Sequence, residues 1–443
     1  MGQRRRILTE IFGFDGWIVA DSYFESEEGE RVRPVLGYAT IRGTRLVLVV
    51  RRRWLPRCSQ CGARCRKHHE LQPTRRWADL SWAGHPVFVE YAPYRVKCRA
   101  CQAAPTEMVG WADPYQRQSR RLQHHLALQA LSMPVTHVAV VHGLSWSTVR
   151  RAEVDALERW DRTREPVPLR HVGVDEKFLG RRGGPRDGHR FVTIVSNLDT
   201  GEPVWIGYGR RKHTLRRWLD ALSADQKKAI VLFAMDMFDA YRFAVRETPG
   251  LEHVVIAHDP FHLMKLAITA LDEMRREVFF RAGPELRKLG GGHGRRWLLL
   301  LAWERTNDDQ RAELRRLWSF NGALARAYQL KEQLRDVLRA PDRATMAKGL
   351  DYILRRTQSR RWRPLRHLHD MLRKHRSDIL PLADHHPRTG RIEALNNNWE
   401  ALVRRARGYR DHQYLLLKLK FITANPVHTE EGAQRFLALG LAA

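Results

Sequence analysis

The sequence predicts a multidomain α+β protein, in which a β-rich N-terminal region and a short helical module precede a mixed α/β domain interrupted by an all-α insertion. Three observations support this prediction. All five cysteines lie between positions 58 and 101. Apolar runs typical of buried strands end in aspartate at positions 175, 236 and 259. The stretch from 263 to about 385 has the spacing of amphipathic helices and no strand pattern.

The chain has 443 residues, which is too long for one ordinary core and indicates several domains. We expect the boundaries where the pattern changes, with the prolines of "REPVPLR" at the start of the α/β domain. The expected domains are residues 1–110 for the β-rich region, 111–163 for the helical module, 164–265 for the first part of the α/β domain, 266–385 for the insertion, 386–424 for the last helix of the α/β domain with a basic cluster, and 425–443 for a C-terminal tail.

The charge of the chain is strongly positive. Its 78 Lys and Arg residues against 49 Asp and Glu residues give a formal net charge of +29, spread along the sequence. This excess favours a polyanionic partner, above all nucleic acid, although a genome rich in arginine codons is an alternative explanation. The apolar runs are far shorter than the roughly 20 residues of a membrane helix. Glu10 and Asp15 interrupt a possible signal peptide, so we expect a cytoplasmic, nucleoid-associated protein.

Two C-x-x-C pairs predict a metal site in the β-rich region. Cys58 and Cys61 lie in "CSQCGARC", and Cys98 and Cys101 lie in "CRAC". Each pair can place two thiolates on one ion, and together the pairs complete a tetrahedral Zn²⁺ site of the ribbon type. The alternating segment "HPVFVEYAPYRVKC" is expected to be the strand that carries the second pair back to the first. Unliganded thiols in a reducing cytosol are the alternative, and Cys65 is a spare in either case.

The segment "VTHVAVVHGLSWSTVRRAEVDALERW" has the pattern of a helix-turn-helix. Val138, Val141 and Leu144 have apolar spacing for a first helix and its turn. Gly143 permits the tight turn, and Ser145 can cap the second helix. The second helix would present its N-terminal half to base edges and phosphates, whereas two simply packed helices are the alternative. The predicted DNA contacts are Trp146, Ser147, Thr148, Arg150 and Arg151.

After residue 164 the predicted order is three strands, a helix, a strand, a helix and a strand. The first strand ends in Asp175, a helix spans 214–228, and the two later strands end at Asp236 and Asp259. This is the order of a ribonuclease-H-like fold, in which the first and fourth strands are neighbours. Asp175 and Asp236 could then share divalent ions, because two carboxylates so close together repel unless a cation lies between them.

A helical segment near the C-terminus, "RIEALNNNWE", can complete the acidic set. Glu393, Asn396, Asn397 and Glu400 lie on one side of such a helix. If the helix packs on the sheet, Glu393 can supply a third carboxylate, with the asparagines as neutral donors beside it. A surface helix with ordinary polar residues is the alternative. Other carboxylates compete at each position: Glu176 with Asp175, Asp239 or Asp259 with Asp236, and Glu400 with Glu393.

Arginines accumulate around Trp362 in the insertion and beyond Glu393 in the last helix. Both groups could contact a DNA backbone, and a solvated helix face is the alternative for the first group. The predicted backbone contacts are Arg360, Arg361, Arg404, Arg405, Arg407 and Arg410.

These motifs together resemble the ISL-three family of bacterial insertion-sequence transposases over nearly the whole chain. The resemblance rests on the order of "CSQCG", "CRAC", "GLSWSTV", "GVDEKF", "DMFDAYRFAV", "HDPFHLMKLA", "NGALARAYQLKEQLR" and "RIEALNNNWEALVRRARGYR". It implies an acidic triad of Asp175, Asp236 and Glu393 that holds two Mg²⁺ or Mn²⁺ ions, with the helical insertion before the glutamate. It also implies an accessory D-x-x-H element of Asp259 and His262. One departure is Ala394, where the family commonly has a glycine.

The resemblance implies a DDE transposase with one structural Zn²⁺ ion. Such an enzyme binds terminal inverted repeats, cleaves double-stranded DNA at the element ends and joins the 3′-hydroxyl to target DNA by two-metal phosphoryl transfer. A homodimer or higher complex is expected, since two ends must be brought together. A DNA-binding regulator with an inactive catalytic domain and a structure-selective nuclease of the same fold are the alternatives. The intact acidic set disfavours the regulator, and the zinc ribbon with the helix-turn-helix disfavours the nuclease.

Overall fold

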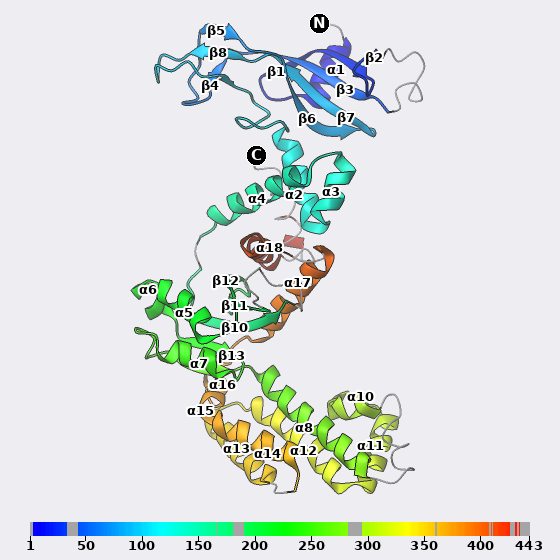
Figure 1. Cartoon of the computed structure of the whole chain (residues 1–443), viewed down its shortest axis with the longest axis vertical. Coiled ribbons are helices and arrows are strands. Elements are labelled where there is room, and N and C mark those ends of the chain that lie inside the picture. The colour runs from blue at the N-terminus through cyan, green and yellow to red at the C-terminus, as the bar shows by residue number, and fades with distance from the viewer. Residues whose placement is uncertain are drawn as a thin grey trace. The chain divides into compact units, whose positions relative to one another are not determined.

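The chain folds into two compact units (Figure 1). One contains Met1–Arg164 together with Asn425–Ala443, and the other contains Glu165–Ala424. Among the helices that the structure describes, none has both the length and the apolar composition of a membrane span. The computed structural model describes residues 3–32, 43–165, 167–179, 190–281, 295–358, 361–406, 409, 411–425, 430–431 and 434.

A five-stranded sheet with the strand order β2-β1-β3-β7-β6 forms the centre of the first unit. Its core is aromatic: the ring of Trp111 lies 4.5 Å from that of Trp17 and 5.5 Å from that of Trp77. β7 lies between β3, to which it is parallel, and β6, to which it is antiparallel. The bounds are α1 Gln3–Phe12, β1 Trp17–Glu25, β2 Arg31–Val32, β3 Arg45–Arg52, β6 Arg75–Trp82 and β7 His85–Tyr91.

Two short antiparallel pairs form the metal-binding ribbon beside this sheet. β4 (Arg57–Cys58) pairs with β9 (Glu107–Met108), and β5 (Lys67–Leu71) pairs with β8 (Tyr94–Lys97). The sequence placed the whole segment from His85 in the ribbon, and this is wrong for its first half. Only β8 carries the second cysteine pair back, because β7 satisfies its backbone hydrogen bonds in the five-stranded sheet.

Three helices complete the first unit: α2 (Arg120–Ser132), α3 (Val135–His142) and α4 (Trp146–Arg162). Gly143 ends α3 in the left-handed conformation with φ 62°, which glycine adopts without steric cost. The Oγ of Ser145 accepts a hydrogen bond from the Thr148 amide at 3.2 Å and caps α4. The predicted turn is therefore confirmed. Val141 is not an inward residue as predicted, since it is 65% exposed and Ala139 is buried in its place.

The second unit contains a five-stranded mixed sheet with the order β12-β11-β10-β13-β14. β10, β11 and β12 are antiparallel, whereas β13 is parallel to both β10 and β14. The first and fourth strands are thus neighbours, as the sequence predicted. The bounds are β10 His171–Phe178, β11 Phe191–Asn197, β12 Pro203–Tyr208, β13 Leu232–Met235 and β14 Val255–His258.

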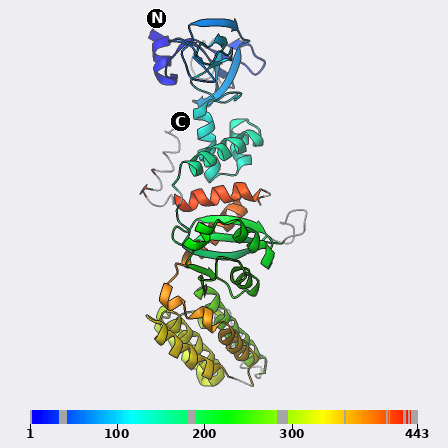
Figure 2. The same cartoon turned by 90° about the vertical axis from the view of Figure 1, so that its left-hand side faces the viewer.

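Helices cover both faces of this sheet. α5 (Lys212–Ala221) and α7 (Asp239–Arg246) pack with the apolar core on one face. α17 (Gly390–Ala406) and α18 (His412–Ala424) pack against β11 and β12 on the other (Figures 1 and 2). The predicted helix over 214–228 is interrupted, because Ser223 forms a capping box that starts α6 (Ala224–Ala229).

The insertion is helical throughout its described residues and shares a core with the sheet. α8 leads from the end of β14 into the helical bundle (Figure 1). Leu232 and Ala257 of the sheet belong to the same apolar cluster as Leu324 and Leu350 of the insertion. The elements are α8 Pro260–Arg281, α10 Arg295–Leu300, η2 Trp303–Arg305, α11 Asp308–Phe320, α12 Gly322–Leu338, α13 Arg343–Thr357, α14 Arg363–Lys374, α15 Arg376–Ile379 and α16 Leu382–His385.

Candidate catalytic and metal-binding sites

Three neighbouring parallel strands are aligned so that an aspartate comes directly after a paired residue on each of them. Val174 of β10 pairs with Met235 of β13, and Met235 pairs with His258 of β14. The residue after each of these positions is an aspartate: Asp175, Asp236 and Asp259. β13 and β14 end directly before their aspartates, whereas β10 continues to Phe178 because it stays paired with β11, so the prediction that the first strand ends in Asp175 is wrong. Since the strands are parallel and aligned, the three carboxylates leave the sheet at the same edge.

α17 makes a direct contact with Asp175. The segment 386–424, predicted to hold one last helix, contains two, because α18 follows α17. The Asn396 side-chain amide donates to the Asp175 Oδ2 at 2.6 Å, and the Asp175 Oδ1 accepts from the Glu176 backbone amide at 2.9 Å. α17 is held here by its apolar side, because Leu395 and Trp399 pack in a common core with strand residues. The sequence predicted neutral donors beside the carboxylates, and Asn396 is one.

Glu393 lies one turn before Asn396 on the same side of α17 and is exposed. In the described part of the chain, two groups of three or more possible metal ligands have their donor atoms within 4.8 Å of one another. Asp175, Asp236 and Glu393 do not form either group. The triad therefore remains a prediction. Glu400, the alternative third carboxylate, accepts from the Lys177 ammonium at 3.3 Å.

Asp259 places a histidine beside Asp236. The Asp259 Oδ1 accepts from the Phe261 amide at 3.0 Å, and its Oδ2 lies 3.1 Å from the His262 Nδ1. The other ring nitrogen of His262 lies 3.9 Å from the Asp236 Oδ2. Burial lowers the pKa of His262, but the hydrogen bond to Asp259 and the charge of Asp236 outweigh it, and the pKa is raised. The raised pKa favours the protonated form of His262 beside Asp236.

The alternative carboxylates have other neighbours. Burial, with the negative charges of Asp175 and Asp236, raises the pKa of Glu176 to about 7. The Glu176 Oε1 lies 3.8 Å from the Arg210 Nη1. Because successive side chains of a strand point to opposite faces, Glu176 points away from the face on which Asn396 contacts Asp175. Asp239 begins α7 and makes an ion pair with Lys374 at 2.6 Å, which lowers the pKa of Asp239.

A buried polar network joins the insertion to the strand ends, and the sequence did not predict it. The His258 Nε2 lies 3.0 Å from the His375 Nδ1, and the other ring nitrogen of His258 lies 3.4 Å from the Met235 carbonyl oxygen. Asp378 accepts from Arg242 at 2.6 Å. Burial lowers the pKa of His258 to about 4 and also lowers that of His375, so both rings are neutral at pH 7.

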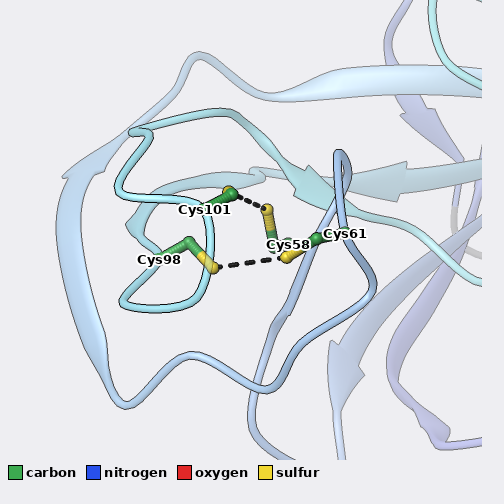
Figure 3. A group of neighbouring side chains, drawn as sticks. All are labelled: Cys58, Cys61, Cys98 and Cys101. Atoms are coloured by element: carbon green, nitrogen blue, oxygen red, sulfur yellow. Dashed lines mark hydrogen bonds between the residues drawn. The ribbon is translucent and has the colours of Figure 1, made fainter.

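The four paired cysteines converge as the sequence predicted (Figure 3). The sulfur atoms of Cys58 and Cys101 lie 3.6 Å apart, and those of Cys61 and Cys98 lie 3.5 Å apart. All four sulfur atoms lie within 4.8 Å of one another. A tetrahedral Zn²⁺ ion with Zn–S bonds of about 2.3 Å requires sulfur atoms at about this separation. The donor set therefore fits one structural zinc ion.

The two cysteine loops have the same backbone shape. The amide of Cys58 donates to the Ala63 carbonyl at 2.9 Å, and the amide of Cys98 donates to the Ala103 carbonyl at 3.0 Å. Gly62 and Gln102, each four residues after the first cysteine of its pair, both have positive φ values. In the second loop, the Cys101 backbone amide is the main group that lowers the pKa of Cys98, to about 6, which favours the thiolate.

Cys65 is not part of the metal group. It is buried, and its thiol contacts the Ala63 carbonyl oxygen at 3.6 Å. Burial raises the pKa of Cys65 to about 11, so it remains a thiol.

The predicted DNA contacts of α4 lie on the accessible side of that helix. Val149 and Leu157 are buried, whereas Trp146, Ser147 and Arg151 are exposed. Thr148 and Arg150 are partly buried, and the Arg150 guanidinium lies 5.7 Å from the centre of the Trp146 ring. Of the backbone contacts, Arg361 and Arg404 are exposed and Arg405 is partly buried, whereas Arg360, Arg407 and Arg410 lie outside the described residues.

Family models of known proteins match the zinc ribbon, the helix-turn-helix and the sheet domain of the chain. A family model for the zinc-finger of the transposases of IS204, IS1001, IS1096 and IS1165 matches residues 54–101, and one for the helix-turn-helix domain of transposase family ISL3 matches residues 107–156. A third model, the DDE-type transposase domain of ISL3, matches residues 172–419.

Two relatives match over most of their length. The chain is 27% identical to the transposase for insertion sequence element IS1001 of Bordetella parapertussis over 365 residues, which cover 82% of the chain and 87% of that protein. It is 29% identical to the transposase for insertion sequence element IS1557 of Mycobacterium tuberculosis (strain CDC 1551 / Oshkosh), over 93% of the chain and 94% of that protein. Because the transposase model spans more than half of the residues, the chain belongs to the ISL3 family of DDE transposases.

Proposed function

We propose that the chain is an active transposase that binds the terminal inverted repeats of an insertion sequence, cleaves DNA at the element ends and joins the freed 3′-hydroxyl to target DNA. The observation that supports it most is the common register of Asp175, Asp236 and Asp259 at one sheet edge, with Asn396 of α17 in contact with Asp175. Metal-dependent phosphoryl transfer uses carboxylates that meet at one point to hold the ions.

Asp175, Asp236 and Glu393 would hold two Mg²⁺ or Mn²⁺ ions, since carboxylate oxygens suit these cations. The placement of Asp175 and Asp236, each directly after paired residues of neighbouring parallel strands, supports a shared cation. Burial, together with the negative charges of Asp175 and Asp236, raises the pKa of Glu176 beside them. When bound, the ions would activate water or the 3′-hydroxyl and stabilise the leaving oxygen. We infer the role of Glu393 from its place one turn before Asn396, which contacts Asp175.

The remaining polar residues have positioning roles. Asn396 fixes one carboxylate oxygen of Asp175, and the Met237 amide donates to the Asp236 Oδ1 at 2.6 Å. Asp259 orients His262 toward Asp236 by the hydrogen bond to its Nδ1. When protonated, the His262 ring partly offsets the acidic cluster and can donate to a phosphate oxygen of the DNA.

We assign end recognition to the zinc ribbon and the helix-turn-helix, within residues 1–163, and cleavage to residues 164–424. The exposed side of α4 supplies Trp146, Ser147 and Arg151 for the DNA groove. Arginines along the second unit would contact backbone phosphates, so the affinity should fall steeply as salt rises. Two ends must meet for joining, and we therefore expect a homodimer or a higher complex on DNA.

A labelled duplex that carries the element end and its flank tests this proposal. The protein should nick the boundary in Mg²⁺ but not in EDTA. Asp175→Asn, Asp236→Asn and Glu393→Gln should each abolish nicking while end binding persists. Glu400→Gln is the matched control, because Glu400 lies on the same side of α17 but is paired with Lys177.

The outcomes separate the candidate functions. Tight end binding without cleavage in Mg²⁺ or Mn²⁺ would favour a DNA-binding regulator, and cutting without end specificity would favour a structure-selective nuclease. Loss of nicking in Glu400→Gln with full activity in Glu393→Gln would transfer the third carboxylate to Glu400.

A further inference from the structure

A hollow in the helical insertion combines an apolar floor with a cationic wall. It has a volume of about 360 Å³ and lies among α8, α12, α13 and α14. Leu330 and Leu365 line it from the buried core, and Met274 lines it from α8. Its size is at the lower end of the range for small-ligand sites, which is about 300–1,000 Å³, so it can hold one small group and not a duplex.

The wall of this hollow carries unneutralised positive charge. Four arginines line it, from α12, α13 and the segment before α14, and no acidic residue is among the described residues that do. Arg326 and Arg355 are exposed and make no ion pair with a carboxylate in the described part of the chain. Guanidinium groups bind phosphate oxygens through paired hydrogen bonds, so the wall suits a phosphate. The four residues are Arg326, Arg355, Arg356 and Arg361.

An aromatic ring and two amides lie beside the arginines. Trp362 lines the hollow and packs against the apolar core of the insertion, and the Arg361 guanidinium lies 5.2 Å from its ring centre. Gln329 and Gln333 line the hollow one turn apart on α12. Aromatic rings stack on nucleobases, and side-chain amides pair with base edges through one donor and one acceptor group. The neighbouring groups thus suit the parts of one nucleotide.

We propose that this hollow binds a single unpaired nucleotide of the DNA substrate, with its base against Trp362 and its phosphate among the arginines. In a duplex the base faces are stacked and only the edges are exposed in the grooves. A base can therefore meet a ring inside a hollow of this size only after it has left the stack. The proposal rests on the proposed function, because its ligand is the DNA on which the chain acts.

The test compares the affinities of full-length protein for element-end duplexes that differ at one position. One duplex is fully paired, and a series carries one extra unpaired thymidine at successive positions across the end and flank. A parallel series replaces that thymidine by an abasic nucleotide, which keeps the flexibility of the bulge but removes the base. We expect tighter binding for at least one thymidine position and no such gain for its abasic counterpart.

Trp362→Ala should lower the preference for the unpaired thymidine by about 5- to 150-fold, the effect of losing one stacked base, with paired-duplex affinity unchanged. Trp362→Phe should retain most of it. Trp297→Ala is the matched control, because Trp297 is 65% exposed on α10 and does not line the hollow. Arg326→Ala, at an exposed position, tests the phosphate contact without removing a packed ring.

Equal affinity for paired and bulged duplexes at every position would overturn the proposal, as would a preference that survives both Trp362→Ala and Arg326→Ala. An equal gain from the abasic series would also overturn it, since bending alone would then explain the binding. If the protein binds and nicks fully paired element ends but shows no preference for a duplex with an unpaired thymidine, only the nucleotide-binding role of the hollow fails. If it binds no element end at all, the proposed function fails as well.

Discussion

The packing of α17 on the central strand can be tested at Gly173. A β-carbon there would lie 2.6 Å from the Ser196 Oγ, 2.8 Å from the Leu198 Cδ2 and 3.1 Å from the Ile392 Cγ1. Ile392 is the residue before Glu393 on α17. Gly173→Ala should therefore displace the side chains of Ser196 and Leu198 and crowd Ile392 of α17, at a cost of about 1–3 kcal/mol for an overpacked core.

Local hydrogen exchange is the appropriate assay, because a two-unit chain does not unfold in one step. In Gly173→Ala, amides of β10 and α17 should exchange faster, whereas those of the helix-turn-helix should not change. DNA nicking should fall with unchanged end binding. The matched control is Gly322→Ala at the start of α12, where a β-carbon meets nothing within 4 Å. Exchange in α17 at the wild-type rate in Gly173→Ala would refute the close approach on which this reasoning depends.

Three further predictions concern metal, pH and the acidic site. Cys98→Ser should abolish zinc binding and unfold the ribbon, because metal supplies much of the folding energy of such small sites. Metal content and circular dichroism measure the two effects, and the control Cys65→Ser should retain the zinc. Because burial lowers the pKa of His258 from 6.5 to about 4, the second unit should be most stable above pH 6.5 and lose stability as the pH falls towards 4. Hydrogen exchange measured between pH 7 and pH 4 should show this loss of stability, and His258→Asn should make the stability of the second unit less dependent on pH. Asn396→Ala should slow nicking about 10- to 150-fold, since a hydrogen bond to a charged group contributes about 1.5–3 kcal/mol. An unchanged nicking rate would show that Asp175 does not need this donor.

Features that depend on local spacing could be predicted from the sequence. Each C-x-x-C pair lies on a loop that closes within a few residues, so the two thiols of a pair are brought together locally. Gly143 and Ser145 specify a turn and a cap by their own backbone and hydroxyl chemistry. Asp175 and Asp236 were placed close together because β10 and β13 are parallel neighbours in register, although β10 does not end at Asp175 as predicted.

Features that depend on contacts between distant segments could not be predicted. Alternation indicated a strand from His85, but its partners β3 and β6 are chosen by packing across the sheet. His258 and His375 meet only when the insertion folds back onto β14, and neither has a sequence pattern that marks it. The helical face of "RIEALNNNWE" was predicted, but only the structure shows that Asn396 is the residue that contacts Asp175.

The position of α17 so late in the chain has a consequence for synthesis. A nascent chain presents the helix-turn-helix and the strands with Asp175 and Asp236 before the ribosome has made Asn396 or its neighbour Glu393. Until α17 and α18 are released, the apolar side of β11 and β12 lacks its cover. On the proposed function, an incomplete product can occupy element ends but not cut them. A gene copy with a frameshift ahead of α17 would then encode a competitor of the intact enzyme and restrain the spread of its own element.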